Sequence, residues 1–260
     1  MIQLEQIKNF FPPSIRDNPI YQKYMIKEYI QLMILDYLSF TYYIRKITFI
    51  GGTNLRLVKE IDRFSEDLDF DCKDLPANEF ISMTDKVLVY LQESGFNVET
   101  RDRKNDKLND FRRNFYFPEF LFNLGLSGHK DERFLIKIES QDQQINYQQE
   151  IATIKGCGFY FSFPVPSDSV MCSMKLSALL NRQKGRDFYD SIFLLSLTSP
   201  DYNFLETKCN ISNLTELKNR IAKMMTSIDI KQKSRDFEHL LFNKNNSQRI
   251  LAFSEFIEDL

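Results

Sequence analysis

Residues 47–71 read ITFIGGTNLRLVKEIDRFSEDLDFD, and this stretch decides how the rest of the chain is interpreted. A mostly apolar run at 47–50 ends in a glycine pair, and residues 54–59 have the spacing of a short amphipathic helix. The segment 67–71 then alternates aspartates with apolar residues. Because side chains on a strand alternate between its two faces, we expect a strand with one acidic and one apolar face.

The acidic face of this strand implies a bound cation. Carboxylates cannot be buried unpaired, because they lose their hydration. Clustered carboxylate oxygens suit Mg²⁺, which usually also takes substrate phosphates. The glycine pair allows a close backbone approach and offers N–H groups to an anion. Alone, Gly-Gly is usually a turn and D-x-D a solvated strand, but together they have the layout of a metal-dependent phosphoryl or nucleotidyl transfer site.

The same stretch resembles the AbiEii/AbiGii toxin family, which has the nucleotidyltransferase fold and supplies the toxin halves of bacterial toxin–antitoxin and phage-defence pairs. The GGTxLR segment and the later RFSEDLDF segment carry the resemblance. It implies an NTP substrate and Mg²⁺, with Asp67 and Asp69 as metal ligands and Asp69 as a catalytic residue. It also implies a phosphate cradle made by three successive residues, Gly51, Gly52 and Thr53.

Three further residues of this stretch have two interpretations each. Arg56 and Arg63 would face phosphate, or would brace the acidic strand. Ser65 stands two residues before Asp67, where its hydroxyl would bind phosphate or would be modified as a means of control.

Composition limits the function classes. The chain has 260 residues with 43% hydrophobic and 27% charged content, which is ordinary for a soluble globular protein of one large domain or two lobes. A net charge of −2 does not indicate nucleic-acid binding, so an RNA site would need a local basic patch. Four scattered cysteines fit reduced thiols in the cytoplasm. We expect neither a signal peptide nor a membrane-spanning helix.

The remaining patterns predict an α+β chain: a nucleotidyltransferase-like mixed sheet lobe flanked by helices at 1–165, and a helical lobe at 166–260. Strands are expected at 47–50, 67–71, 96–100, 114–124, 134–139 and 159–163. Helices are expected near the N-terminus and at 18–43, 54–59, 79–93, 167–181, 186–197, 213–225, 230–241 and 248–257.

Glu139 is the candidate third carboxylate. It ends the strand pattern at 134–139, close to the apolar-Lys-apolar-acid pattern of the family. There it would complete a two-metal site, or would act as base on the incoming hydroxyl. The alternative is a surface glutamate at a strand end.

A second segment, MKLSALLNRQKGRDFYD at 174–190, also resembles the family pattern. Lys175 would neutralise charge on the leaving pyrophosphate. Asp187 would pair with Lys175 or Arg186, or bind the nucleotide sugar, and it shares a helix face with Asp190. The alternative is an ordinary surface network of ion pairs.

The most basic stretch is 101–113, RDRKNDKLNDFRR, which reads either as a solvated hairpin loop or as an arm that contacts an RNA backbone. The resemblance implies nucleotide transfer to an acceptor hydroxyl, with a tRNA 3′ end as the acceptor and a cognate antitoxin as the partner. Two alternatives stay open: transfer to a small molecule such as an antibiotic, and a non-catalytic NTP-binding module.

Overall fold

The structure is a computed structural model, which describes residues 3–73, 75–101 and 111–260. It divides into two compact units. The first unit holds most of the residues up to 165, and the second holds the residues from 166 onward. Two short segments, 61–63 and 145–148, belong to the second unit although they precede 166 in the sequence.

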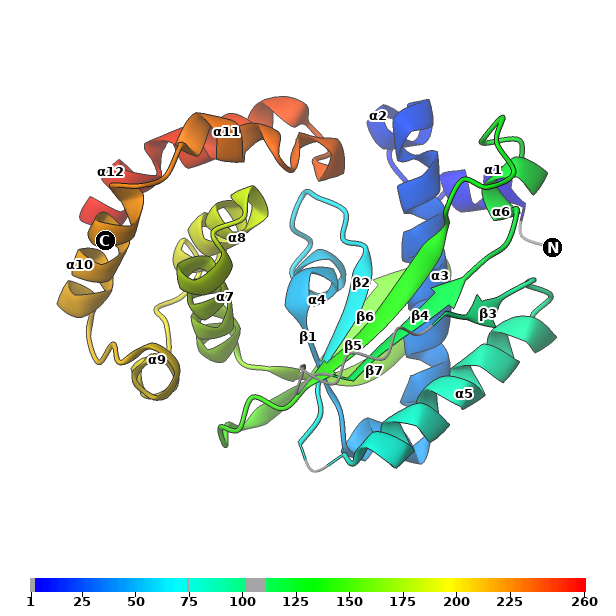
Figure 1. Cartoon of the computed structure of the whole chain (residues 1–260), viewed down its shortest axis with the longest axis horizontal. Helices are drawn as coiled ribbons and strands as arrows, with labels where there is room; N and C mark the ends of the chain where they lie inside the picture. Colours follow the sequence, from blue (N-terminus) through cyan, green and yellow to red (C-terminus); the bar gives the residue numbers. More distant parts are fainter. Residues whose placement is uncertain (1–2, 74, 102–110) are drawn as a thin grey trace. The chain divides into compact units, whose positions relative to one another are not determined.

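The first unit is built on a five-stranded sheet of order β1-β2-β5-β4-β3 (Figure 1). Strands β2 and β5 are parallel, and the other neighbouring strands are antiparallel. The bounds are Thr48–Ile50 for β1, Asp67–Asp71 for β2, Glu99–Thr100 for β3, Phe111–Tyr116 for β4 and Leu135–Gln141 for β5.

One face of this sheet is apolar, as the alternation in the sequence predicts. Leu68 and Phe70 of β2 are fully buried. The β-hairpin formed by β6 (Gln149–Gly156) and β7 (Phe159–Pro166) packs against this layer through Phe163, whose ring lies 6.0 Å from the rings of Phe49 and Phe70. The aspartates of β2 are therefore left on the opposite face of the sheet.

Helix α3 (Gln22–Ser39) is buried on most of its circumference, and it contacts α5 (Ala77–Glu93). Its Tyr29 ring meets Phe159 of the hairpin at 5.5 Å. The other helical elements of this unit are short: α1 (Leu4–Lys8), α2 (Pro13–Arg16), η1 (Pro19–Tyr21), η2 (Tyr42–Arg45), α4 (Gly51–Leu57) and α6 (Phe120–Asn123).

The second unit is helical, and α7 (Asp168–Arg182) packs on α8 (Gly185–Leu195). A Cβ at Gly185 would collide with the backbone carbonyl of Lys233 and lie 2.8 Å from the ring of Phe237. Glycine therefore allows α8 to approach residues 233–237 closely. The remaining elements are α9 (Tyr202–Cys209), α10 (Leu214–Met225), α11 (Ile230–Arg235), η3 (Glu238–Leu240), η4 (Lys244–Ala252) and α12 (Phe253–Glu258).

Several predicted elements were wrong in extent, among them the helices expected at 18–43 and 54–59, which are α3 at Gln22–Ser39 and α4 at Gly51–Leu57. The strand expected at 114–124 is β4 followed by α6, because Pro118 offers no N–H to a ladder and Glu119 takes a left-handed conformation with φ of 51°. The strand expected at 96–100 covers only two residues. The helix expected at 230–241 ends at Arg235, because the chain then turns so that Phe242 N–H donates to the Asp62 carbonyl at 3.0 Å.

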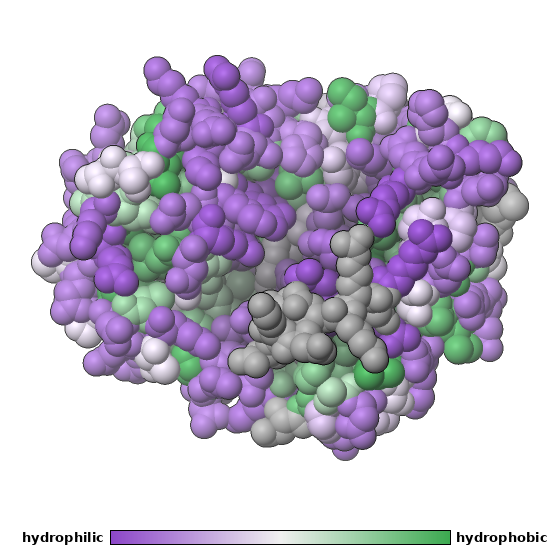
Figure 2. Space-filling model, viewed as in Figure 1, coloured by the Kyte–Doolittle hydropathy of each residue, from purple (hydrophilic) through white to green (hydrophobic). Residues whose placement is uncertain are grey.

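The hydropathy of the surface and the state of the cysteine thiols are those that the composition indicates. Figure 2 shows hydrophilic side chains over most of the visible face, with apolar residues in scattered spots. The four cysteines are buried and free. Across the described ranges, every helix is too short or too polar to cross a bilayer.

Candidate functional site

The register of three strands builds the polar face of the sheet. In the parallel pair β2–β5, Asp69 lies opposite Glu139 and Asp67 lies opposite Lys137. In the antiparallel pair β4–β5, Arg112 lies opposite Glu139. Since residues paired across neighbouring strands point to the same face, these five side chains form one surface. The three carboxylates that the sequence singled out therefore lie on the same face of two neighbouring strands.

Gly51 begins α4 beside the Asp69 carboxylate. Its φ is +83°, a conformation that side chains with a Cβ rarely adopt. An added Cβ would stand 2.7 Å from Cβ and Cγ of Asp69, and closer still to Oδ2. Glycine is thus required for two independent reasons, its backbone conformation and the space that Asp69 occupies.

Thr53 and Asn54 attach α4 to the sheet. The buried Thr53 hydroxyl donates to the backbone carbonyl of Asp67 at 2.5 Å. Asn54 Nδ2 donates to the Phe49 carbonyl at 2.7 Å. The Thr53 side chain therefore fixes the position of β2, whereas Gly51 and its neighbour Gly52 are half-buried at the start of α4.

Helix α3 braces the loop and helix around the acidic strand. Arg56 donates from Nε and Nη2 to the Glu28 carboxylate, at 2.8 Å and 3.0 Å. The carbonyl of Ser65 accepts from Gln31 Nε2 at 3.2 Å. Glu28 and Gln31 are supporting residues that the sequence analysis missed. They are the polar exceptions among the buried positions of α3, where polar groups need partners.

Two side-chain cations lie against the carboxylates. Lys137 Nζ is 3.0 Å from Asp67 Oδ2, and Arg112 Nε is 2.8 Å from Glu139 Oε1. Within the part of the chain that the structure describes, no three carboxylate, histidine or cysteine side chains converge as a ready metal site. The donor chemistry nevertheless fits Mg²⁺, because Asp67 and Asp69 are half-exposed hard oxygen ligands on one face.

A second cluster lies within the helical unit. Asp190 accepts from Arg63 Nε and Nη2, both at 2.7 Å, and from Lys175 Nζ at 2.9 Å. Both partners and Asp190 are buried. Burial alone would raise the pKa of Asp190, but Arg63 and Lys175 hold that pKa below its ordinary value. Burial lowers the pKa of Lys175, and Asp190 opposes this effect.

Asp187 has a different set of partners from those expected. It accepts from Arg182 at 2.7–3.1 Å and from the backbone N–H of Lys184 at 3.0 Å. The latter bond belongs to the capping box of α8. Asp190, its neighbour one turn later, is the carboxylate that binds Lys175.

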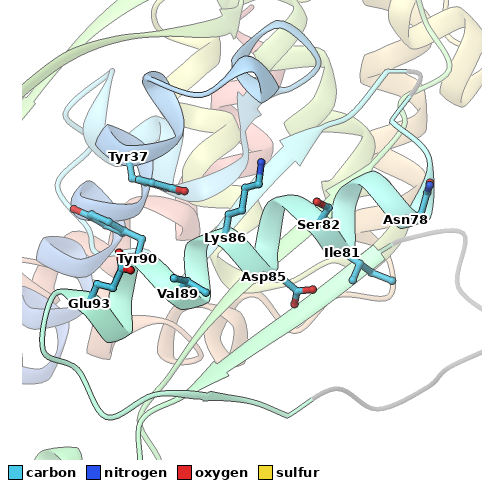
Figure 3. A pocket seen from close by; sticks show the side chains of 9 residues that line it. All are labelled: Tyr37, Asn78, Ile81, Ser82, Asp85, Lys86, Val89, Tyr90 and Glu93. Atoms are coloured by element: carbon cyan, nitrogen blue, oxygen red, sulfur yellow. The ribbon is translucent and has the colours of Figure 1, made fainter.

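A surface pocket of the first unit lies apart from the predicted site residues. It has a volume of about 470 Å³ and runs along α5, where Tyr37 of α3 stacks on Tyr90 with ring centroids 4.4 Å apart (Figure 3). None of the predicted site residues lines it. Of the basic stretch, residues 102–110 lie outside the described residues, so the predicted RNA-contacting arm is described only at Arg101 and 111–113.

Known proteins share this fold. The structure is similar to MenT4, a nucleotidyltransferase toxin from Mycobacterium tuberculosis, with a TM-score of 0.60, 16% identity, and coverage of 100% of this chain and 91% of that one. It is also similar to JHP933 from Helicobacter pylori, with a TM-score of 0.55, 18% identity, and 90% coverage of each chain. No curated protein sequence matches the chain significantly.

The family assignment comes from the sequence profile described as "Nucleotidyl transferase AbiEii toxin, Type IV TA system", which matches residues 34–253. This range contains both clusters described above, and the solved structures share the fold that the profile implies. The predicted family and α+β fold class are thereby confirmed: the chain belongs to the AbiEii nucleotidyltransferase toxin family.

Proposed function

We propose that this nucleotidyltransferase transfers a nucleotide from an NTP to an acceptor hydroxyl with the help of Mg²⁺. The observation that carries the proposal is the polar face of the sheet, where Asp67 and Asp69 share one side of β2 and Glu139 lies in register with Asp69. Asp67, Asp69 and Glu139 would hold the metal. When bound there, Mg²⁺ would stabilise the negative charge that develops on the reacting phosphate.

The start of α4 supports an adjacent phosphate position. A glycine is required at Gly51 because Asp69 takes up the space of a side chain. The backbone of Gly51, Gly52 and Thr53 would face the phosphates, while the Thr53 hydroxyl holds the strand. Glu139 would alternatively accept the proton of the incoming hydroxyl as a general base.

Lys175 would neutralise the departing pyrophosphate, and the helical unit holds this lysine firmly. Its ammonium is fixed by Asp190, which Arg63 in turn holds by two bonds. Asp187 would contact the nucleotide sugar. Arg56 and Ser65 would contribute by keeping the loop before β2 in place, through Glu28 and Gln31.

The acceptor that we propose is the 3′ end of a tRNA. Modification there would block aminoacylation and arrest growth, and a cognate antitoxin in the same cytoplasm would restrain the enzyme. The exposed Arg101, whose guanidinium carbon lies 3.6 Å from the centroid of the Tyr116 ring, and the exposed Arg112 would add salt-sensitive contacts to an RNA backbone.

The test is incubation of the purified protein with total bacterial RNA, Mg²⁺ and each α-³²P-labelled NTP in turn. We expect a labelled tRNA-sized band with one NTP, lost in Asp69→Asn and on chelation of the metal. Asp131→Asn, the same change at an exposed position of the same unit, should label RNA like the wild type. Labelling of a small molecule instead of RNA would refute the tRNA acceptor, and no transfer to either would refute the proposed reaction.

A further inference from the structure

The two cations on the polar face of the sheet are placed where a metal ion would have to bind. Lys137 reaches Asp67 from the neighbouring strand, and Arg112 reaches Glu139 from the strand beyond it. Both pairs follow from the register, since each cation lies directly opposite its carboxylate. Asp67 and Glu139 thus each meet a cation of the chain itself before any ligand arrives.

Carboxylates are concentrated on this face of the sheet. Asp67, Asp69 and Asp71 share one side of β2, and Glu139 of β5 lies in register with Asp69. Lys137 and Arg112 pair with two of these carboxylates. The oxygen atoms gathered here are of the kind that a divalent cation prefers.

The pairs are of a kind that can open. The side chains of Lys137 and Asp67 are 32% and 22% exposed, and those of Arg112 and Glu139 are 47% and 26% exposed. Pairs this accessible to water are weak and screened by salt. The lysine stem is also flexible, so its ammonium can leave one oxygen for another. In contrast, the fully buried pairs of Asp190 have no such freedom.

We propose that Lys137 is an internal counter-ion of the metal site, which holds Asp67 in the absence of metal and must release it when a divalent cation binds. Arg112 does the same for Glu139. This inference rests on the proposed function, because it takes Asp67 and Asp69 as the metal ligands. Its consequence is that the free enzyme binds metal weakly, and that Lys137 and Arg112 become available to the phosphates of an incoming NTP once the carboxylates are occupied.

The test is direct binding of Mn²⁺, as a spectroscopic substitute for Mg²⁺, to the full chain without nucleotide, followed by electron paramagnetic resonance. We expect Lys137→Met to bind Mn²⁺ about tenfold more tightly than the wild type, which corresponds to about 1.4 kcal/mol. Lys137→Arg restores the charge and should return the affinity to the wild-type value. Lys155→Met removes a lysine from an exposed position of β6 in the same unit and should leave the affinity unchanged.

The outcomes separate this inference from the function on which it rests. Equal Mn²⁺ affinity in the wild type and Lys137→Met, with binding lost in Asp69→Asn, would overturn the counter-ion role and leave the metal site standing. Mn²⁺ binding that Asp69→Asn does not alter would overturn the metal site itself. If Lys137→Met does not fold, Arg112→Met provides the second variant, and its affinity should also rise above that of the wild type.

Discussion

Replacement of Asp190 by asparagine should strongly destabilise the helical unit. The carboxylate accepts three charge-assisted hydrogen bonds, two from Arg63 and one from Lys175, and all three side chains are buried. Asparagine keeps the shape of the side chain but removes its charge. The two cations would then lose the negative charge that they share, in a medium that solvates them poorly.

The size of the effect follows from this geometry. Lys175 can relieve part of the cost by losing its proton, because burial already lowers its pKa. Arg63 cannot lower the cost in this way, since a guanidinium does not lose its proton in proteins. Removal of one partner from a buried ion pair costs about 3–5 kcal/mol. For a chain of this size, the midpoint of thermal unfolding should fall by roughly 6–20 °C.

Urea unfolding followed by circular dichroism at 222 nm would measure this loss, with Asp236→Asn as the control because Asp236 is exposed in the same unit. A double variant adds a second criterion: Arg63→Met combined with Asp190→Asn should be more stable than Asp190→Asn alone, because it removes the uncompensated cation. A loss of less than about 1 kcal/mol in Asp190→Asn would refute the reasoning, because that is the contribution of a surface pair.

The pH dependence has a defined sign. Burial raises the pKa of Asp190, but Arg63 and Lys175 outweigh it, so the folded-state pKa lies below the unfolded value of about 3.9. The stabilisation is therefore complete above the unfolded pKa and is lost as the pH falls below about 4 towards the folded pKa. The stability difference between the wild type and Asp190→Asn should shrink as the pH falls below about 4. A decrease of the same difference towards high pH would report the loss of the Lys175 proton in the variant, since burial lowers the pKa of that lysine.

Three other substitutions or treatments have expected outcomes. Gly51→Ala should cost about 1–3 kcal/mol of folding stability and abolish transfer, because its φ is +83° and its Cβ would collide with Asp69; a denaturant titration and the labelling assay measure both. Glu28→Gln should cost about 1.5–3 kcal/mol in the same titration by weakening the two bonds from Arg56, and an unchanged midpoint would show that the pair is dispensable. The thiols should react with Ellman's reagent at pH 8 only after unfolding, since all four are buried and burial raises the pKa of three of them to about 12, at Cys72, Cys157 and Cys172.

The faces of the central strands could be predicted from local pattern alone. Alternation in 67–71 and 134–139 separates the acidic from the apolar side chains, and a period of two leaves no other arrangement. The pairing of these strands could not be predicted in this way, because β2 and β5 are parallel neighbours that are not consecutive in sequence. Only this register shows that Asp69 faces Glu139 and that Lys137 faces Asp67.

The ion-pair partners in the second cluster could be predicted even less well from the sequence. The sequence pattern singles out Lys175 and Asp187, and places Asp190 on the same helix face as Asp187. It does not reveal that Arg63, which is 127 positions before Asp190, is buried against it. Tertiary packing determines this pairing, because a buried guanidinium needs a carboxylate and Arg63 lies against Asp190. Asp187 is held at the start of the helix by Arg182.

Helix α3 shows how such a partner can be anticipated. Glu28 and Gln31 are buried in a helix whose other buried residues are apolar. A buried glutamate without a cation would be far too costly, so its presence in that pattern already requires an Arg or Lys from another element. The structure supplies Arg56 from α4, and Gln31 binds the Ser65 carbonyl in the segment that leads into β2. Through these two buried polar residues, helix α3 holds α4 and the segment at Ser65, the two parts of the chain that lead into the acidic strand.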